Sequence, residues 1–315
     1  MTREYSIQSK LKVQKTTKIG KNVILYIFLA IMAIIVIVPF YWMFNVSLQS
    51  RDEVLKLGPF ANDFNPSLFP HELTFKNYPD AFVFTETTTG SISFLPALRN
   101  TLIVAVFSTV IGTIFSILVA FALSRLNFKG RELIFTVLLA TMMIPGEMMV
   151  LSNYKTVAAL GWVGLGDTGY GSFYAMIIPF LISIFHIYML RQNFKQIPNE
   201  LYYAAKVDGT SDFKYLVKVM VPMAKSSIVT IVILKLMGTW NAYVWPNLVA
   251  KPEYKLVTAW LRMGFKDPAG VGDLAKVLVN LQMAATIIVT VPLLLLFIFF
   301  RKYIMSGVSR SGIKG

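Results

Sequence analysis

Few residue types in this chain could carry out chemistry, and those that could are scattered. The chain has no cysteine, and its two histidines, His71 and His186, lie far apart in the sequence. Disulfides, thiolate metal sites and a cysteine nucleophile are therefore excluded, and neither an HExxH zinc helix nor a histidine cluster occurs. We expect no catalytic residue, no metal site and no cofactor bound by this chain.

Two glycine patterns bear on nucleotide binding. Gly164, Gly166 and Gly169 satisfy the pattern GxGxxG, but they follow no predicted strand and open no Rossmann unit, so we expect no dinucleotide site there. The phosphate-binding pattern GxxxxGK followed by Ser or Thr does not occur in the sequence. Any ATP-driven work must therefore come from a partner protein.

Two charged residues fall inside apolar stretches. Lys235 lies near the middle of one stretch and Glu147 lies in another, and a charge within a bilayer is costly unless it is paired or faces water. One hypothesis is that the two pair across the interior of a helix bundle. The alternatives are that Lys235 lines a wet cavity alone, or that Glu147 lies at the outer interface. We interpret His186 as a hydrogen-bonded core or cavity residue.

The elements that position these residues follow from composition. The 315 residues are 56% hydrophobic and 15% charged, with a mean hydropathy of +0.62, whereas soluble proteins are roughly a quarter charged. A membrane-spanning helix needs about 20 mainly apolar residues. We predict an all-α membrane protein with about six spans, at residues 22–47, 97–124, 132–152, 172–190, 222–246 and 277–300. Pro39, Pro145 and Pro292 are expected to kink or break helices.

The net charge of +14 is distributed as expected for a membrane protein, and we expect no nucleic-acid partner. Lys and Arg gather in the N-terminal arm 1–21, in residues 125–131 and 191–225, and in the tail after residue 300. With six spans these segments share one side, which the bias of basic residues marks as cytoplasmic. We therefore predict that both termini are cytoplasmic. The opposite-side segments are then residues 49–96, 153–171 and 247–276.

Between the fourth and fifth predicted spans, residues 191–221 are too polar to span and too regular for a simple linker. We predict a short helix with Asn199 as its N-cap, ended by Gly209, and a second helix that begins at Ser211 and runs to Pro222. This segment is either an amphipathic helix on anionic lipid or a docking helix for another protein's groove. The helical pattern by itself does not distinguish the two.

Sequence motifs extend this interpretation. The stretch YYAAKVDGTSDFKYLVKVMVP resembles the EAA loop of ABC-importer permeases, in which EAA is followed by three residues, Gly, nine residues and I-x-L-P. Flanking stretches resemble the carbohydrate-permease branch, which is maltose-permease-like. They are MMIPGE (142–147), MLRQNFKQIPNEL (189–201), TWNAYVWP (239–246) and the terminal GIKG. One departure from the family bears on coupling, because Tyr203 stands where the motif has glutamate. The loop after the third span, ALGWVGLGDTGYGS, is also longer and richer in glycine than is usual in the family.

The resemblance implies a type I ABC-importer permease, with residues 22–315 as its transmembrane domain, in a bacterial cytoplasmic membrane. Such a permease pairs with a second homologous permease, two ABC ATPase subunits that hold ATP and Mg, and an external solute-binding protein that delivers a carbohydrate. The chain itself is then not an enzyme. The residues implied in coupling to the ATPases are Glu200, Tyr203, Ala204, Ala205, Asp208, Gly209 and Pro222.

A substrate path is predicted near the outer end of the fifth span. Trp240, Asn241 and Tyr243 suit a sugar, which has apolar ring faces and hydroxyl edges, and Lys235 and Glu147 are further candidates. The alternative for the aromatic residues is an interfacial belt in contact with membrane lipid.

Two other classes of protein remain as rivals. An ion-coupled secondary transporter should show inverted repeats and paired intramembrane carboxylates. We find neither in the sequence, since Glu147 is the only acid that we place inside a span. A membrane enzyme such as a lipid-linked glycosyltransferase needs a carboxylate pair for a metal or a general base, and no such constellation is evident.

Overall fold

The computed structural model describes the backbone of residues 2–54, 66–88, 93–163, 169–263, 265 and 278–309. Side chains are described over residues 21–54, 66–83, 93–163, 169–262, 265 and 278–303. Every regular element in these ranges is helical, which confirms the all-α class. The chain divides into two compact units, residues 1–79 with 269–287 and residues 80–268 with 288–315.

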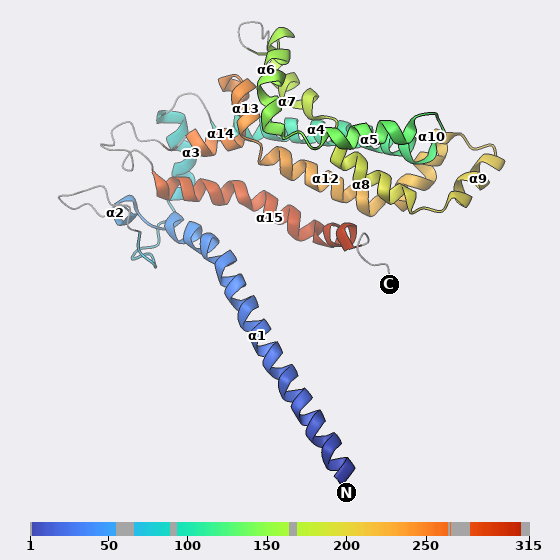
Figure 1. Ribbon diagram of the computed structural model, residues 1–315. Coiled ribbons are helices and arrows are strands. Elements are labelled where there is room, and N and C mark those ends of the chain that lie inside the picture. The colour runs from blue at the N-terminus through green and yellow to red at the C-terminus, as the bar shows by residue number, and fades with distance from the viewer. Residues whose placement is uncertain are drawn as a thin grey trace. The chain divides into compact units, whose positions relative to one another are not determined.

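The first unit contains α1 (Thr2–Ser47), α2 (Arg51–Val54), the start of α3 (Asn77–Thr88) and the first part of α15 (Val279–Ser309). From residue 2 on, the predicted arm and the span 22–47 form one continuous helix (Figure 1). From Lys21 to Phe40 the side chains of α1 are exposed, and most are apolar. Its surface is therefore compatible with a lipid environment.

The end of α1 is fixed by one buried side chain. Asn77 Nδ2 donates to the carbonyls of Ser47 and Gln49, both at 2.8 Å, and Asn77 Oδ1 accepts from Asn280 Nδ2 at 2.9 Å. The amide thereby satisfies one backbone carbonyl in the last turn of α1 and one just after it.

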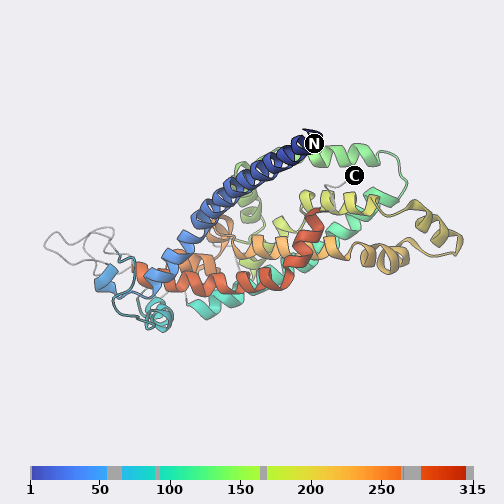
Figure 2. The same ribbon diagram turned by 90° about the horizontal axis from the view of Figure 1, so that it is seen from below.

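The second unit is built on α4 (Phe94–Arg125), α8 (Ile184–Lys195) and α12 (Lys225–Trp240), which run side by side in Figures 1 and 2. The buried face of α4 carries small residues, namely Ala105, Ser108, Gly112, Ser116 and Ala120. Small side chains let helices approach closely, as is typical of membrane proteins. The hydroxyls of Ser108 and Ser116 donate to carbonyls four residues back, so their burial leaves no donor unpaired.

A buried arginine in α8 ties neighbouring helices together. Arg191 of α8 is 2% exposed, donates to Leu123 O at 2.9 Å and pairs with Glu132 of α5 (Arg131–Thr141) at 2.7 Å. Its guanidinium also lies 3.8 Å from the centre of the Phe135 ring. These contacts hold the start of α5 against α4 and α8.

Three of the predicted spans are bent rather than continuous. The span 132–152 is α5, a 3-10 turn (Gly146–Met149) and α6 (Val150–Ala159), with an 89° bend at Pro145. The span 172–190 is α7 (Gly171–Ile177), a 3-10 turn (Ile178–Phe180) and α8, bent by 42°. The span 222–246 begins in a helix that is bent by 81° against α12, and it ends in the separate helix α13 (Val244–Val249).

The other three predicted spans lie within single helices. Lys21–Ser47, Phe94–Arg125 and Val279–Tyr303 are long and apolar enough to cross a membrane, and the described residues give up to six spans if each bent pair counts as one. Residue 277, where the last span was predicted to begin, lies outside the described residues. The prediction for Pro145 is confirmed, whereas α1 and α15 continue through Pro39 and Pro292.

One end of the second unit is closed by a cap of short helices. After α13 come a 3-10 turn (Pro252–Tyr254) and α14 (Val257–Met263), which lie beside the first part of α4. Asn100 donates to Glu253 O at 2.8 Å, and Thr101 Oγ1 accepts from the Val257 amide at 2.9 Å. Buried Trp260 packs against Phe94 with ring centres 4.8 Å apart. This cap lies at the opposite end of α4 from α9 (Asn199–Val207) (Figure 1).

Candidate functional site

The segment between α8 and α12 forms the two short helices that the sequence predicted. The first is α9, and the second runs from α10 (Asp212–Tyr215) through a π-helical turn (Leu216–Met220) to α11 (Val221–Met223). Gly209 joins them at φ +69°, a conformation that glycine adopts at little cost. The Ser211 hydroxyl accepts from the Lys214 amide and caps the second helix.

The π-helical turn has a local cause. Pro222 has no amide hydrogen to give to the carbonyl four residues earlier, and its ring crowds that carbonyl. The backbone widens over Leu216–Met220, directly before the proline, and the direction of the chain then changes by 81°. Pro222 therefore lies in α11, just before the corner at Ala224 and close to where the sequence predicted the second helix to end.

Arg125 joins the α9 segment to the helices beneath it. This last residue of α4 is 7% exposed, and its guanidinium donates to the carbonyls of Phe194, at 2.7 Å, and Ile197. It also donates to the side-chain oxygen of Asn199. The prediction that Asn199 caps α9 is wrong, because its side chain accepts from Arg125 and Pro198 occupies the cap position. A single guanidinium thus contacts the ends of α4 and α8 and the start of α9.

A second set of contacts joins α9 to α10. The Tyr202 hydroxyl donates to Asp212 Oδ1 at 2.7 Å, and Lys206 Nζ lies 2.7 Å from the same oxygen. The hydrogen bond to Asp212 raises the pKa of Lys206, and desolvation together with the Asp212 contact raises the pKa of Tyr202. Both groups therefore keep their protons at neutral pH, and the two helices form one unit.

The outer surface of this segment is unusually apolar for a solvent-facing helix. Val207 is 88% exposed, Phe213 68% and Tyr203 63%, and Ala204 is also exposed. Ala205 is half-buried and packs on the core with Tyr202. The remaining residues predicted in coupling are all exposed, namely Glu200, Asp208, Gly209 and Pro222. The structure thus places the predicted residues on α9 and the turn that follows it, except for Pro222, which lies in α11 before the corner to α12.

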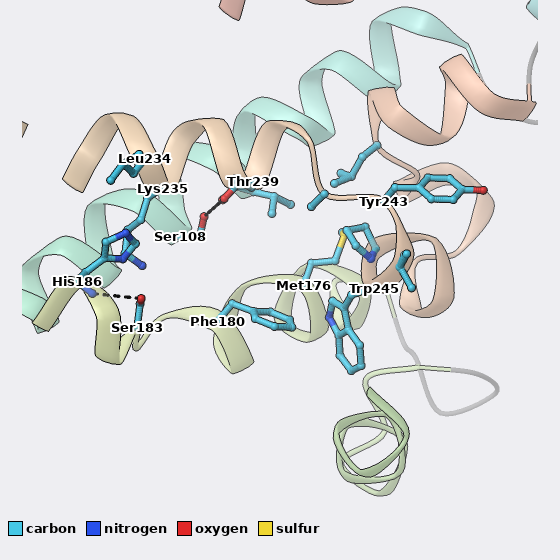
Figure 3. Close-up of a pocket in the computed structure, with 16 residues that line it drawn as sticks. Ser108, Met176, Phe180, Ser183, His186, Leu234, Lys235, Thr239, Tyr243 and Trp245 are labelled. Carbon is cyan, nitrogen blue, oxygen red and sulfur yellow. Dashed lines mark hydrogen bonds between the residues drawn. The ribbon is translucent and has the colours of Figure 1, made fainter. Parts of the chain in front are cut away.

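A cavity of about 470 Å³ lies between α4, α8, α12 and α13. Its polar lining is Ser108, Ser183, His186, Lys235 and Thr239, and its aromatic lining is Phe180, Tyr243 and Trp245 (Figure 3). Ser108 and Thr239 share a hydrogen bond of 3.3 Å across the cavity wall. The lining contains no carboxylate among the described residues.

Two of the five residues predicted for a substrate path line this cavity, namely Lys235 and Tyr243. Trp240 is buried, and its indole donates to Val289 O at 3.2 Å. Asn241 caps the end of α12 and donates to Met237 O, and Glu147 lies exposed in the 3-10 turn after Pro145. In this structure these three side chains are outside the cavity.

The hypothesis of a Lys235–Glu147 pair is not met in this structure. Lys235 Nζ donates to the backbone carbonyl of Leu181 at 3.1 Å, and no ion pair among the described side chains involves it. The break between α7 and α8 frees that carbonyl from a helical hydrogen bond. Lys235 lines a cavity, as one of the alternatives has it. His186 lines the same cavity as predicted, but its buried Nδ1 has no hydrogen-bond partner, so the predicted hydrogen bond is not observed at that atom.

Sequence reasoning missed three prominent lining residues, Phe180, Trp245 and Ser108. Trp245 lies in the TWNAYVWP stretch, so the motif held the signal, but it did not show which of its aromatic residues would face inward. Phe180 and Ser108 lie in apolar stretches that carry no distinguishing pattern.

Comparisons with known proteins identify the family. Residues 112–310 match the family described as "Binding-protein-dependent transport system inner membrane component". The chain belongs to this family. The permease relationship inferred from the EAA-like loop is thereby confirmed, and the apolar helices are those of an integral membrane protein.

Relatives match this permease over nearly its full length. The arabinooligosaccharides transport system permease protein AraQ of Bacillus subtilis (strain 168) is 27% identical, covering 93% of this chain and 96% of the relative. The trehalose/maltose transport system permease protein MalG of Thermococcus litoralis is 29% identical, covering 94% and 98%. The sn-glycerol-3-phosphate transport system permease protein UgpE of Brucella abortus (strain 2308) is 27% identical, covering 91% and 95%.

Solved structures share the fold. A chain of a bacterial ABC transporter involved in the import of the acidic polysaccharide alginate is 23% identical, with a TM-score of 0.71 over 90% of this chain and 95% of the other. A bacterial alginate ABC transporter in complex with an alginate pentasaccharide-bound periplasmic protein is 19% identical, with a TM-score of 0.51 over 72% and 86%. The permease fold predicted from the sequence is thereby confirmed.

Proposed function

We propose that this permease is one half of the membrane pore of an ATP-driven importer that brings a sugar or oligosaccharide into the cytoplasm. Its partners are a second homologous permease, two ABC ATPase subunits that hold ATP and Mg, and an external binding protein that delivers the carbohydrate. Two of the relatives described above are named for sugar transport, and one solved neighbour was captured with a sugar-loaded periplasmic protein. The chain lies in a bacterial cytoplasmic membrane with both termini inside.

The observation that carries the proposal is the projecting segment of α9 and α10. Its exposed Tyr203, Val207 and Phe213 offer an apolar surface of the kind that helix-in-groove recognition uses. We assign this surface to the ATPase, with residues 191–221 as the coupling loop. Tyr203 then contributes an aromatic contact where the motif has a carboxylate.

Arg125 provides the connection from this surface to the cavity. It contacts α9 through Asn199, α8 through Phe194 and the segment after α8 through Ile197, and it ends α4. The same α4 contributes Val104 and Ser108 to the cavity wall. Movement of α9 on ATPase closure would thus be carried along α4 to the substrate path.

The test is purification of the tagged chain from its native membrane in mild detergent, with identification of stoichiometric partners. We expect an ATPase and a second permease with the wild type. Ala204→Arg, at an exposed position of α9, should lose the ATPase and retain the second permease, because the large charged side chain blocks the docking surface.

Ala159→Arg is the matched control, since Ala159 is also exposed but lies at the end of α6, on the side predicted to be external. This variant should keep both partners. If the wild-type chain purifies alone, the importer proposal fails and the ion-coupled secondary transporter becomes the better hypothesis.

A further inference from the structure

One cation in the cavity between α4, α8, α12 and α13 has no counter-charge among the residues that line it. Lys235 is 8% exposed, and its single assigned hydrogen bond goes to the Leu181 carbonyl. An ammonium group has three hydrogens to donate, and the cavity lining supplies no carboxylate among the described residues. An isolated charge in such surroundings is costly, so an ammonium group here would be stabilised by an anionic ligand.

The fold makes room for this ammonium group. A Cβ atom on Gly112 of α4 would lie within 2.5 Å of both Lys235 Nζ and Leu181 O. Glycine at this position therefore allows α4, α8 and the lysine to meet. Packing and the Leu181 carbonyl, which the break in the span exposes, hold the lysine side chain in a defined position. Such preorganisation is expected of a binding site and not of a surface lysine.

The neighbouring groups suit a charged sugar. His186 lies beside Lys235 at one end of the cavity (Figure 3), and its buried Nδ1 has no hydrogen-bond partner. The Ser108 and Thr239 hydroxyls lie on the wall, and the faces of Phe180 and Trp245 lie farther along (Figure 3). The volume of about 470 Å³ is in the usual range of small-molecule sites, about 300–1,000 Å³.

We propose that this cavity binds a saccharide with an anionic substituent, a uronate or a sugar phosphate, whose oxyanion pairs with the Lys235 ammonium. The inference rests on the proposed function and specifies its substrate class. The ring's apolar face lies against Phe180 or Trp245, and its hydroxyls contact His186, Ser108 and Thr239. A neutral sugar would fill the same space but leave the ammonium group unpaired, so the site selects the anion.

The test measures sugar binding to the purified complex of this permease with its co-purifying partners, without the external binding protein. The probes are digalacturonate, glucose 6-phosphate and maltose, and the method is isothermal titration calorimetry. We expect one of the two anionic sugars to bind the wild type at least about tenfold more tightly than maltose, as a charge-assisted hydrogen bond predicts. The anion that binds more tightly identifies carboxylate or phosphate as the preferred group.

Substitutions then assign the preference to Lys235. Lys235→Gln keeps a donor for Leu181 O but removes the charge, and it should weaken anion binding by about tenfold or more while leaving maltose binding unchanged. Lys235→Arg should retain the preference. Lys255→Gln is the matched control, because Lys255 Nζ also donates to a backbone carbonyl, that of Asn247 at 2.6 Å, but does not line the cavity.

The inference is overturned if the wild type binds maltose as tightly as both anionic sugars, if it binds no sugar, or if Lys235→Gln leaves anion binding intact. The proposed function survives each of these results provided that the ATPase and the second permease co-purify. Should Lys235→Gln fail to assemble, the wild-type preference and the Lys235→Arg variant decide the question.

Discussion

At the scale of residues, Arg125 is where the structure adds most to the account of coupling. Arg125→Ala would leave the Phe194 and Ile197 carbonyls and the Asn199 amide without their shared donor. Loss of such buried hydrogen bonds costs about 1–3 kcal/mol each. We expect the variant to keep its ATPase partner but to show several-fold less substrate uptake per ATP hydrolysed, measured in proteoliposomes with the binding protein present.

Arg131→Ala is the control for this prediction. Arg131 lines the same pocket as Arg125, Asn199 and Tyr202, but its hydrogen bonds go to Leu126 O at 3.1 Å and to Glu132, within the turn between α4 and α5, and not to α9. We expect the ratio of uptake to hydrolysis to stay at the wild-type level. An unchanged ratio in Arg125→Ala would show that α9 communicates with the cavity by another route.

At the scale of elements, the hinge between α9 and α10 depends on the backbone of Gly209. Its φ is +69°, and an added Cβ would meet nothing within 4 Å, so a side chain there introduces only backbone strain. Valine is strongly disfavoured at positive φ, and the strain is on the order of 1–3 kcal/mol. We expect Gly209→Val to reorient α9 and to lower co-purification of the ATPase.

Gly130 offers a matched comparison, because it has φ +83° and equally open surroundings but lies at the start of α5. Gly130→Val carries the same kind of strain and should leave ATPase co-purification unchanged. Equal losses in the two variants would attribute the effect to general destabilisation and not to the coupling segment.

At the scale of the whole molecule, the proposed orientation of the chain rests on the positions of its basic segments. Because the protein has no cysteine, each introduced cysteine is a unique site for a membrane-impermeant maleimide. We expect Val207→Cys, at an 88% exposed position, to react only in inside-out vesicles, and Leu73→Cys, at a 64% exposed position, to react only in intact spheroplasts. The reverse pattern would place the α9 segment outside and exclude ATPase docking on it.

The sequence by itself determined the all-α membrane class, the positions of the apolar stretches and the two-helix form of the segment between α8 and α12. These follow from local signals, namely a run of apolar residues, a glycine at the αL position and a serine N-cap. Gly209, Ser211 and Pro222 have the roles that their residue types predict. Local chemistry decides such features, so neighbouring residues in the chain were enough.

Only the tertiary structure decided how sharply the spans bend and which side chains face the cavity. Pro145 marked the break after Thr141 in the sequence, but hydropathy carries no information on backbone direction, so the break after Phe180 was not visible in it. Trp240 and Trp245 belong to one motif, yet α12 ends between them, and Trp240 turns toward Val289 while Trp245 lines the cavity. Lys235 and Arg125 find their acceptors 54 and 69 to 74 residues away in the chain, because helix packing, rather than sequence spacing, brings those carbonyls and side-chain oxygens within reach.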